Sequence, residues 1–126
     1  MLDGVPIILP ALSQSQEIQD RAARVGFDWP EISPVFAKVF EELEEVRSAV
    51  TDAARAGELG DLLFAVVNLV RWYNVDAESA LRAANQKFRR RFAHIEKRAR
   101  EANRELTGLS LAEMDVWWDE AKDLED

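Results

Sequence analysis

The feature that most constrains the fold is an apolar segment from Leu62 to Val70, in which Asn68 is the only polar residue. The segment is too short to span a bilayer, and it lacks the alternation of a half-buried strand. Apolar side chains on nearly every face are typical of a helix in the centre of a bundle. The sequence therefore predicts an all-α protein built around this segment.

Helix start and stop patterns divide the remaining chain. The predicted helices cover residues 9–25, 33–57, 58–74, 76–104 and 110 onward, with Gly57 closing the second. Ser33 before Pro34 favours a helix start, Asp76 is a predicted N-cap, and Ser110 with Glu113 matches a capping box. Short connections favour antiparallel neighbours. We expect an antiparallel bundle of four main helices plus a short C-terminal helix.

Length and composition narrow the function. The 126 residues fit one domain, predicted over residues 11–126 after a linker-like segment at 1–10. A net charge of −8 argues against nucleic acid or an anionic membrane as the main partner. There is no cysteine and only one histidine, His94, so thiolate chemistry and sites needing two histidines are excluded. The first residues do not match a secretory signal, which predicts a cytoplasmic protein.

Two acidic clusters on predicted helices indicate a metal site. Glu42 and Glu45 are three residues apart on the flank of an apolar face, and Glu58 and Asp61 repeat this spacing. Asp61 adjoins the apolar segment, where an unpaired carboxylate is costly. Four carboxylates brought together need a cation, and oxygen ligands suit magnesium or manganese.

A simpler reading of the second cluster stays open. Glu58 then serves only as a favourable charge near a helix N-terminus, and Asp61 pairs with an arginine. In the first cluster, Glu44 points away from the apolar face and is expected to be a solvated surface charge.

Residues 82–104 carry nine Lys or Arg against two Glu. Lys87 and Arg91 border the apolar face of this helix, where they could contact the phosphates of a polyanion bridged by magnesium. Trp118 continues an apolar line in the last helix, and core packing is the competing explanation. Phe27 and Trp29 lie in a loop, where they either staple the loop or stack on a base.

With these residues in place, the chain resembles the MazG family of nucleoside triphosphate pyrophosphohydrolases. The family motif reads here as Glu41-Glu42-x-x-Glu45, a gap of 12 residues, and Glu58-x-x-Asp61. The gap is at the short limit for the family. Segments 19–30, 60–70 and 84–92 and the closing SLAEMDVWWDEAK also resemble it, and the N-terminal residues resemble the entry into the C-terminal domain of two-domain members.

The resemblance implies an all-α enzyme that uses Mg²⁺, or Mn²⁺ as a substitute, to cut nucleoside triphosphates into a monophosphate and pyrophosphate, as nucleotide-pool house-cleaning. It implies a homodimer or higher homo-oligomer. The implied metal ligands are Glu42, Glu45, Glu58 and Asp61. The implied catalytic residues are Lys38, Glu41, Glu42 and Glu45. The implied substrate-binding residues are Lys38, Asn85, Lys87, Arg91, Trp118 and Lys122.

The alternative is a helical module that binds nucleotides, or other proteins, without catalysis. A highly charged, amphipathic surface supports this alternative. Which carboxylate acts as general base, and which base or sugar is preferred, are left open by the sequence.

Overall fold

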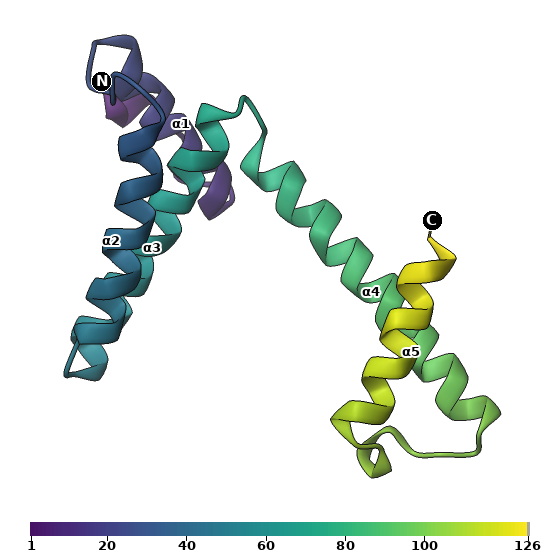
Figure 1. Ribbon diagram of the computed structural model, residues 1–126. Helices are drawn as coiled ribbons and strands as arrows, with labels where there is room; N and C mark the ends of the chain where they lie inside the picture. Colours follow the sequence, from purple (N-terminus) through teal and green to yellow (C-terminus); the bar gives the residue numbers. More distant parts are fainter. Residues whose placement is uncertain (126) are drawn as a thin grey trace. The chain divides into compact units, whose positions relative to one another are not determined.

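The computed structural model describes residues 1–125 and confirms the all-α class. Five α-helices and two 3-10 turns follow one another, and no strand occurs in this part of the chain (Figure 1). The helices are α1 (Ala11–Arg24), α2 (Ser33–Ser48), α3 (Asp52–Trp72), α4 (Ala77–Glu101) and α5 (Leu111–Leu124), with turns η1 (Leu2–Gly4) and η2 (Leu106–Gly108). Within the same residues, none of the helices combines the length and apolar character needed to cross a bilayer.

The chain forms two compact units, Met1–Ala80 and Leu81–Asp126. In the first unit, α2 and α3 run antiparallel as a helical hairpin, and α1 packs against α3 (Figure 1). Val35, Ala65 and Val67 form the buried core of this unit. The burial of the apolar segment predicted from the sequence is therefore partial, because one side of α3 leaves large side chains such as Leu63 exposed.

The boundary between α2 and α3 corrects the sequence-based prediction. Gly57 does not separate the two helices; α2 ends at Ser48 and α3 begins at Asp52. The hydroxyl oxygen of Thr51 accepts a hydrogen bond from the amide of Ala54 at 3.1 Å and so caps α3. Glycine inside a helix costs only about 1 kcal/mol relative to alanine, so one exposed glycine does not end a helix that Thr51 caps.

The capping patterns in the sequence correctly predicted the starts of α4 and α5. Ser79 donates its amide to Asp76 at 2.9 Å, as predicted for the start of α4. The capping box of α5 is confirmed, with reciprocal bonds of 3.1 Å between Ser110 and Glu113. Ser33, in contrast, is the first residue of α2 and makes no capping bond. Its hydroxyl therefore does not play the predicted N-cap role.

The loop between α1 and α2 is anchored on α3 by the carboxylate of Asp28. Arg71 donates to one Asp28 oxygen at 2.7 Å, and the indole N–H of Trp72 and the amide of Trp29 donate to the same oxygen at 3.3 and 2.8 Å. Burial by itself raises the pKa of Asp28, but the hydrogen bonds from Arg71 and Trp29 lower it overall. Asp28 is therefore stabilised in its charged form.

In the second unit, the chain turns back after α4, and α5 crosses α4 and contacts it through side chains (Figure 1). The rings of Phe88 and Trp118 lie 5.3 Å apart, and Ile95, Ala99 and Ala121 are buried. These contacts make Trp118 part of the apolar packing of this unit, as the core reading of its sequence position expected.

We expect Asp28→Asn to lower the free energy of unfolding by about 1–2 kcal/mol at pH 7, because the variant loses charge-assisted hydrogen bonds to Arg71 and Trp72. The pKa of Asp28 is lower in the folded state, so its contribution is complete above the unfolded value of about 3.9 and is lost as the pH falls through the folded value. Urea unfolding of parent and variant from pH 7 to pH 2 measures this.

The matched control is Asp115→Asn, since Asp115 is exposed and forms no ion pair within residues 1–125. If the difference in free energy of unfolding between Asp28→Asn and the parent stays constant down to pH 2, the ionised carboxylate of Asp28 does not stabilise the loop.

Candidate active site

Three carboxylates meet across the hairpin of α2 and α3. Glu42 comes from α2, and Glu58 and Asp61 come from neighbouring turns of α3. One oxygen of each lies within 4.8 Å of the others. The antiparallel hairpin places the last turns of α2 opposite the first turns of α3, which is why residues separated in sequence converge. The predicted convergence of the two acidic clusters is therefore observed for these three side chains.

Glu42 is the buried member of this acidic cluster, with 7% of its surface exposed. The ammonium of Lys38, one turn earlier on α2, lies 3.2 Å from one Glu42 oxygen and 3.5 Å from Glu41. The hydrogen bond to Glu42 is the main reason that the pKa of Lys38 is raised. The other Glu42 oxygen is buried and accepts no hydrogen bond within the described residues.

Glu58 is surrounded by other carboxylates. Partial burial and the charges of Glu45, Glu42 and Asp61 raise the pKa of Glu58. Within residues 1–125, neither Glu58 nor Asp61 forms an ion pair with an arginine or lysine, so the arginine partner considered for Asp61 is not found there. Carboxylate oxygens without cationic partners, one of them unpaired and buried, fit a hard divalent cation.

Glu45 is placed differently from the other predicted ligands. It is exposed and does not belong to the group within 4.8 Å, although its charge acts on Glu58. Glu44 lies 3.8 Å from Arg47 in a solvent-exposed pair, which matches the surface role expected for it.

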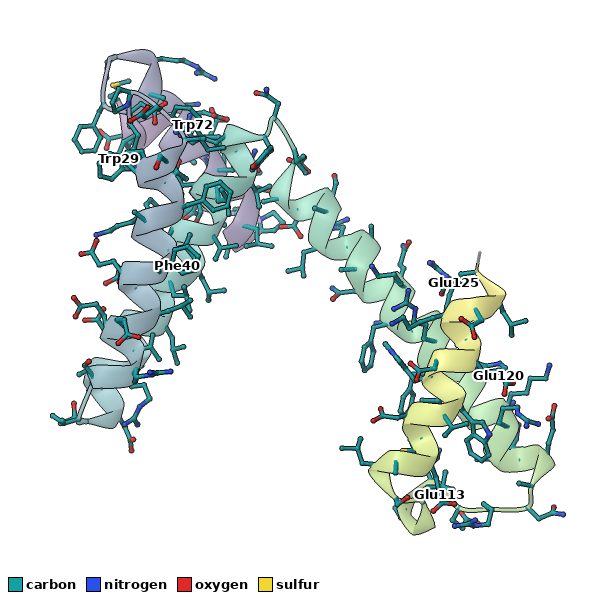
Figure 2. The ribbon with its side chains drawn as sticks, viewed as in Figure 1. Trp29, Phe40, Trp72, Glu113, Glu120 and Glu125 are labelled. Carbon is teal, nitrogen blue, oxygen red and sulfur yellow. The ribbon has the colours of Figure 1, made fainter. Side chains whose placement is uncertain are left out.

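A cleft of about 730 Å³ adjoins the acidic cluster in the same unit. Lys38, Glu42 and Asp61 line one part of it, and the aromatic residues Phe27 and Trp29 line another. Figure 2 shows Trp29 and Trp72 at the end of the unit that carries the α1–α2 loop, with Phe40 further along α2. The cleft therefore combines charged groups that suit a metal and a phosphate with a flat apolar surface.

Gln19 also lines this cleft, and sequence reasoning did not single it out. It is a buried polar residue on α1. A weak signal was present, because Gln19 falls on the same helical face as Leu12 and Ala22. The ion pair between Asp28 and Arg71 left no comparable signal.

In the unit Leu81–Asp126, Arg91 and Trp118 lie together. The Arg91 guanidinium stands 5.4 Å from the centre of the Trp118 ring and donates to Glu125 at 2.9 Å. This bond lowers the pKa of Glu125. Figure 2 labels Glu125 on the chain just after α5. Asn85, Lys87 and Lys122 are exposed, and no ion pair joins them to another residue described here.

Comparison with known proteins gives consistent matches. The MazG nucleotide pyrophosphohydrolase domain family matches residues 32–96. The chain is 48% identical to the nucleoside triphosphate pyrophosphohydrolase of Escherichia coli K12, over 96% of this chain and 48% of that protein. It is 43% identical to the nucleoside triphosphate pyrophosphohydrolase/pyrophosphatase MazG of Thermotoga maritima, over 91% of this chain and 45% of that protein. The chain thus spans about half the length of these curated relatives.

Asp61→Asn should change how stability responds to metal. Without metal the variant should melt at or above the parent, because one repelling charge is removed from the acidic cluster. Mg²⁺ at 100 times its dissociation constant should stabilise the parent by about 2.7 kcal/mol and the variant much less. Thermal melting with EDTA and with a Mg²⁺ series measures both effects.

Glu44→Gln is the matched control and should respond to Mg²⁺ as the parent does, since within residues 1–125 Glu44 pairs with Arg47 on the surface and lies outside the acidic cluster. Equal stabilisation of parent and Asp61→Asn, with a lower metal-free melting temperature for the variant, would show that Asp61 is a structural partner and not a metal ligand.

Proposed function

Because the chain belongs to the MazG nucleotide pyrophosphohydrolase family, we propose that it hydrolyses nucleoside triphosphates to a nucleoside monophosphate and pyrophosphate. The observation that carries this proposal is the convergence of Glu42, Glu58 and Asp61 beside a cleft large enough for a nucleotide. The role we propose is nucleotide-pool house-cleaning in the cytoplasm. The catalytic domain is proposed to cover residues 11–126, with residues 1–10 as a linker.

The proposed cofactor is Mg²⁺, with Mn²⁺ as a substitute, held by Glu42, Glu45, Glu58 and Asp61. The set of oxygen donors supports a hard cation. Partial burial and the neighbouring carboxylates raise the pKa of Glu58, and a bound cation would offset both effects. When bound, the metal polarises a phosphate and lowers the pKa of a water. Glu45 joins this set on the family motif, since its carboxylate lies outside the group of three.

The proposed reaction is attack of water on the α-phosphorus. A P–O bond forms to the water oxygen, the bond to the bridging oxygen of the β-phosphate breaks, and pyrophosphate leaves. Glu41, Glu42 and Glu45 are the candidates to orient the water or accept its proton. Lys38 holds Glu42 in place through their 3.2 Å contact and offers positive charge to a phosphate.

The proposed ligands of the triphosphate and sugar are Lys38, Asn85, Lys87, Arg91, Trp118 and Lys122. Arg91 already binds an anion, the carboxylate of Glu125, with two of its nitrogens. A phosphate would exchange with this carboxylate, since both are oxygen anions that fit the guanidinium fork. Stacking on Trp118 keeps the Arg91 side chain in place during the exchange.

A homodimer or higher homo-oligomer is part of the proposal. Large apolar side chains of α2 and α3 are not covered by their own unit; Phe40 and Leu63 are 64% and 62% exposed. Exposed apolar patches of this kind mark interaction sites. Nucleic acids and membranes are not proposed as partners, because the net charge is −8.

We expect the purified protein to release pyrophosphate from ATP, GTP, CTP or UTP only when Mg²⁺ or Mn²⁺ is present. Glu45→Gln and Asp61→Asn should each lower kcat/KM at least 100-fold, whereas Glu44→Gln should be nearly silent. In ¹⁸O-labelled water the label should enter the monophosphate. Label only in pyrophosphate would mean attack at the β-phosphorus, and binding without turnover in every case would favour the non-catalytic alternative.

We expect light scattering after size-exclusion chromatography to give a mass of at least twice the 14.3 kDa of one chain. Replacing Leu63 by Glu should shift the mass toward the monomer, because a charge is costly inside an apolar interface. Val116→Glu is the control on α5, outside the unit formed by α1, α2 and α3. A parent protein that elutes as a monomer at micromolar concentration would contradict the oligomer.

A further inference from the structure

One buried polar group in the cleft has no role in the proposed hydrolysis, the amide of Gln19. Gln19 is 7% exposed, and its Nε2 donates to the backbone carbonyl of Phe64 at 3.1 Å. A carbonyl only accepts hydrogen bonds, so this contact fixes which end of the amide faces α3. The other end, Oε1, is shielded from solvent and accepts no hydrogen bond within residues 1–125.

An unpaired buried acceptor is uncommon and costs stability. Gln19 lines the cleft together with Asp61 and Glu42 of the acidic cluster. An N–H group of a molecule that fills the cleft would supply the missing donor and remove this cost. A hydrogen-bond donor is therefore the kind of atom that would satisfy this oxygen.

Asn68 adds a complementary group on α3. Arg71 donates to the Asn68 side-chain oxygen at 3.0 Å and is itself held by Asp28. This contact occupies the oxygen of Asn68, and within residues 1–125 its NH₂ group donates no hydrogen bond. The cleft thus offers an acceptor from Gln19 and a donor from Asn68, and each is oriented by a bond on its other side.

The same cleft has a flat apolar part. Trp29 and Phe27 line it and are 43% and 83% exposed, although large aromatic side chains are normally covered. The bonds from Arg71 and Trp72 to Asp28 hold the loop that carries both rings. Aromatic side chains on an anchored loop suit a planar heterocycle.

We propose that this cleft binds the nucleobase of the triphosphate, an inference that rests on the proposed function. Gln19 Oε1 accepts a hydrogen bond from an N–H of the base, the Asn68 amide donates to a ring nitrogen or carbonyl, and Trp29 stacks on the ring. Each common base carries a donor next to an acceptor on its pairing edge. Gln19 and Asn68 therefore recognise bases as a class, and they disfavour a base whose N–H has been alkylated.

The test measures binding without turnover, by isothermal titration calorimetry in Mg²⁺ with α,β-methylene-ATP. This analogue cannot be cut at the α–β position. Inorganic tripolyphosphate, which has no base, is titrated in parallel. Gln19→Met keeps the length of the side chain and removes its carbonyl. The substitution should raise the Kd for the analogue about tenfold, which corresponds to one lost hydrogen bond. It should leave the Kd for tripolyphosphate unchanged.

Gln14→Met is the matched control, because Gln14 lies on the same helix and also donates to a backbone carbonyl, that of Ile7 at 3.3 Å, but does not line the cleft. It should bind both ligands as the parent does. Trp29→Ala changes an exposed loop residue, so it tests the same site if Gln19→Met does not fold. This variant should bind the analogue at least fivefold more weakly than the parent and bind tripolyphosphate equally well.

The proposal is overturned if Gln19→Met, or Trp29→Ala in its place, binds the analogue as tightly as the parent. It is also overturned if the variant's Kd for tripolyphosphate rises by the same factor as its Kd for the analogue. Failure of the proposed function gives a different result. If the parent cuts no nucleoside triphosphate but binding of the analogue still depends on Gln19, the hydrolysis is wrong and the base site stands. If the parent cuts ATP and Gln19→Met matches it in Kd, only the base site is wrong.

Discussion

Three carboxylates held within 4.8 Å of one another repel unless a cation lies between them, and the rest of the unit Met1–Ala80 is arranged around this constraint. Packing of α2 against α3, helices that contribute the buried residues Val35 and Val67, holds the carboxylates together. Lys38 compensates only one of them, Glu42. The remaining charge is what a bound divalent cation would offset, and such a cation would invert the local field in favour of the proposed polyanionic substrate.

The acidic cluster and the cleft depend on different interactions. Helix pairing places the carboxylates, whereas the cleft depends on single polar contacts that join distant parts of the chain. Asp28 ties the aromatic loop to Arg71, and Gln19 ties α1 to the Phe64 carbonyl. A substitution in these contacts is therefore expected to alter what the cleft accepts while the carboxylates keep their positions.

Sequence reasoning succeeded where the relevant interaction is local. The capping box of Ser110 and Glu113 spans three residues, and Glu58 and Asp61 share a face because helical spacing requires it. It failed at Gly57, since a cost of about 1 kcal/mol does not end a helix that is capped at Thr51. The bond from Gln19 to Phe64 spans 45 residues and leaves no periodic pattern, so only the folded chain reveals it.

The hairpin of α2 and α3 also has a consequence for the order of folding. Glu42 and Asp61 belong to adjacent helices joined by residues 49–51, so little loop entropy is lost when they meet, and contacts of low sequence separation form early. The bonds from α1 and its loop to α3 close much longer loops. We therefore expect the mutually repelling charges to come together before the cleft forms. A divalent cation present during refolding should act on the rate at which the hairpin closes.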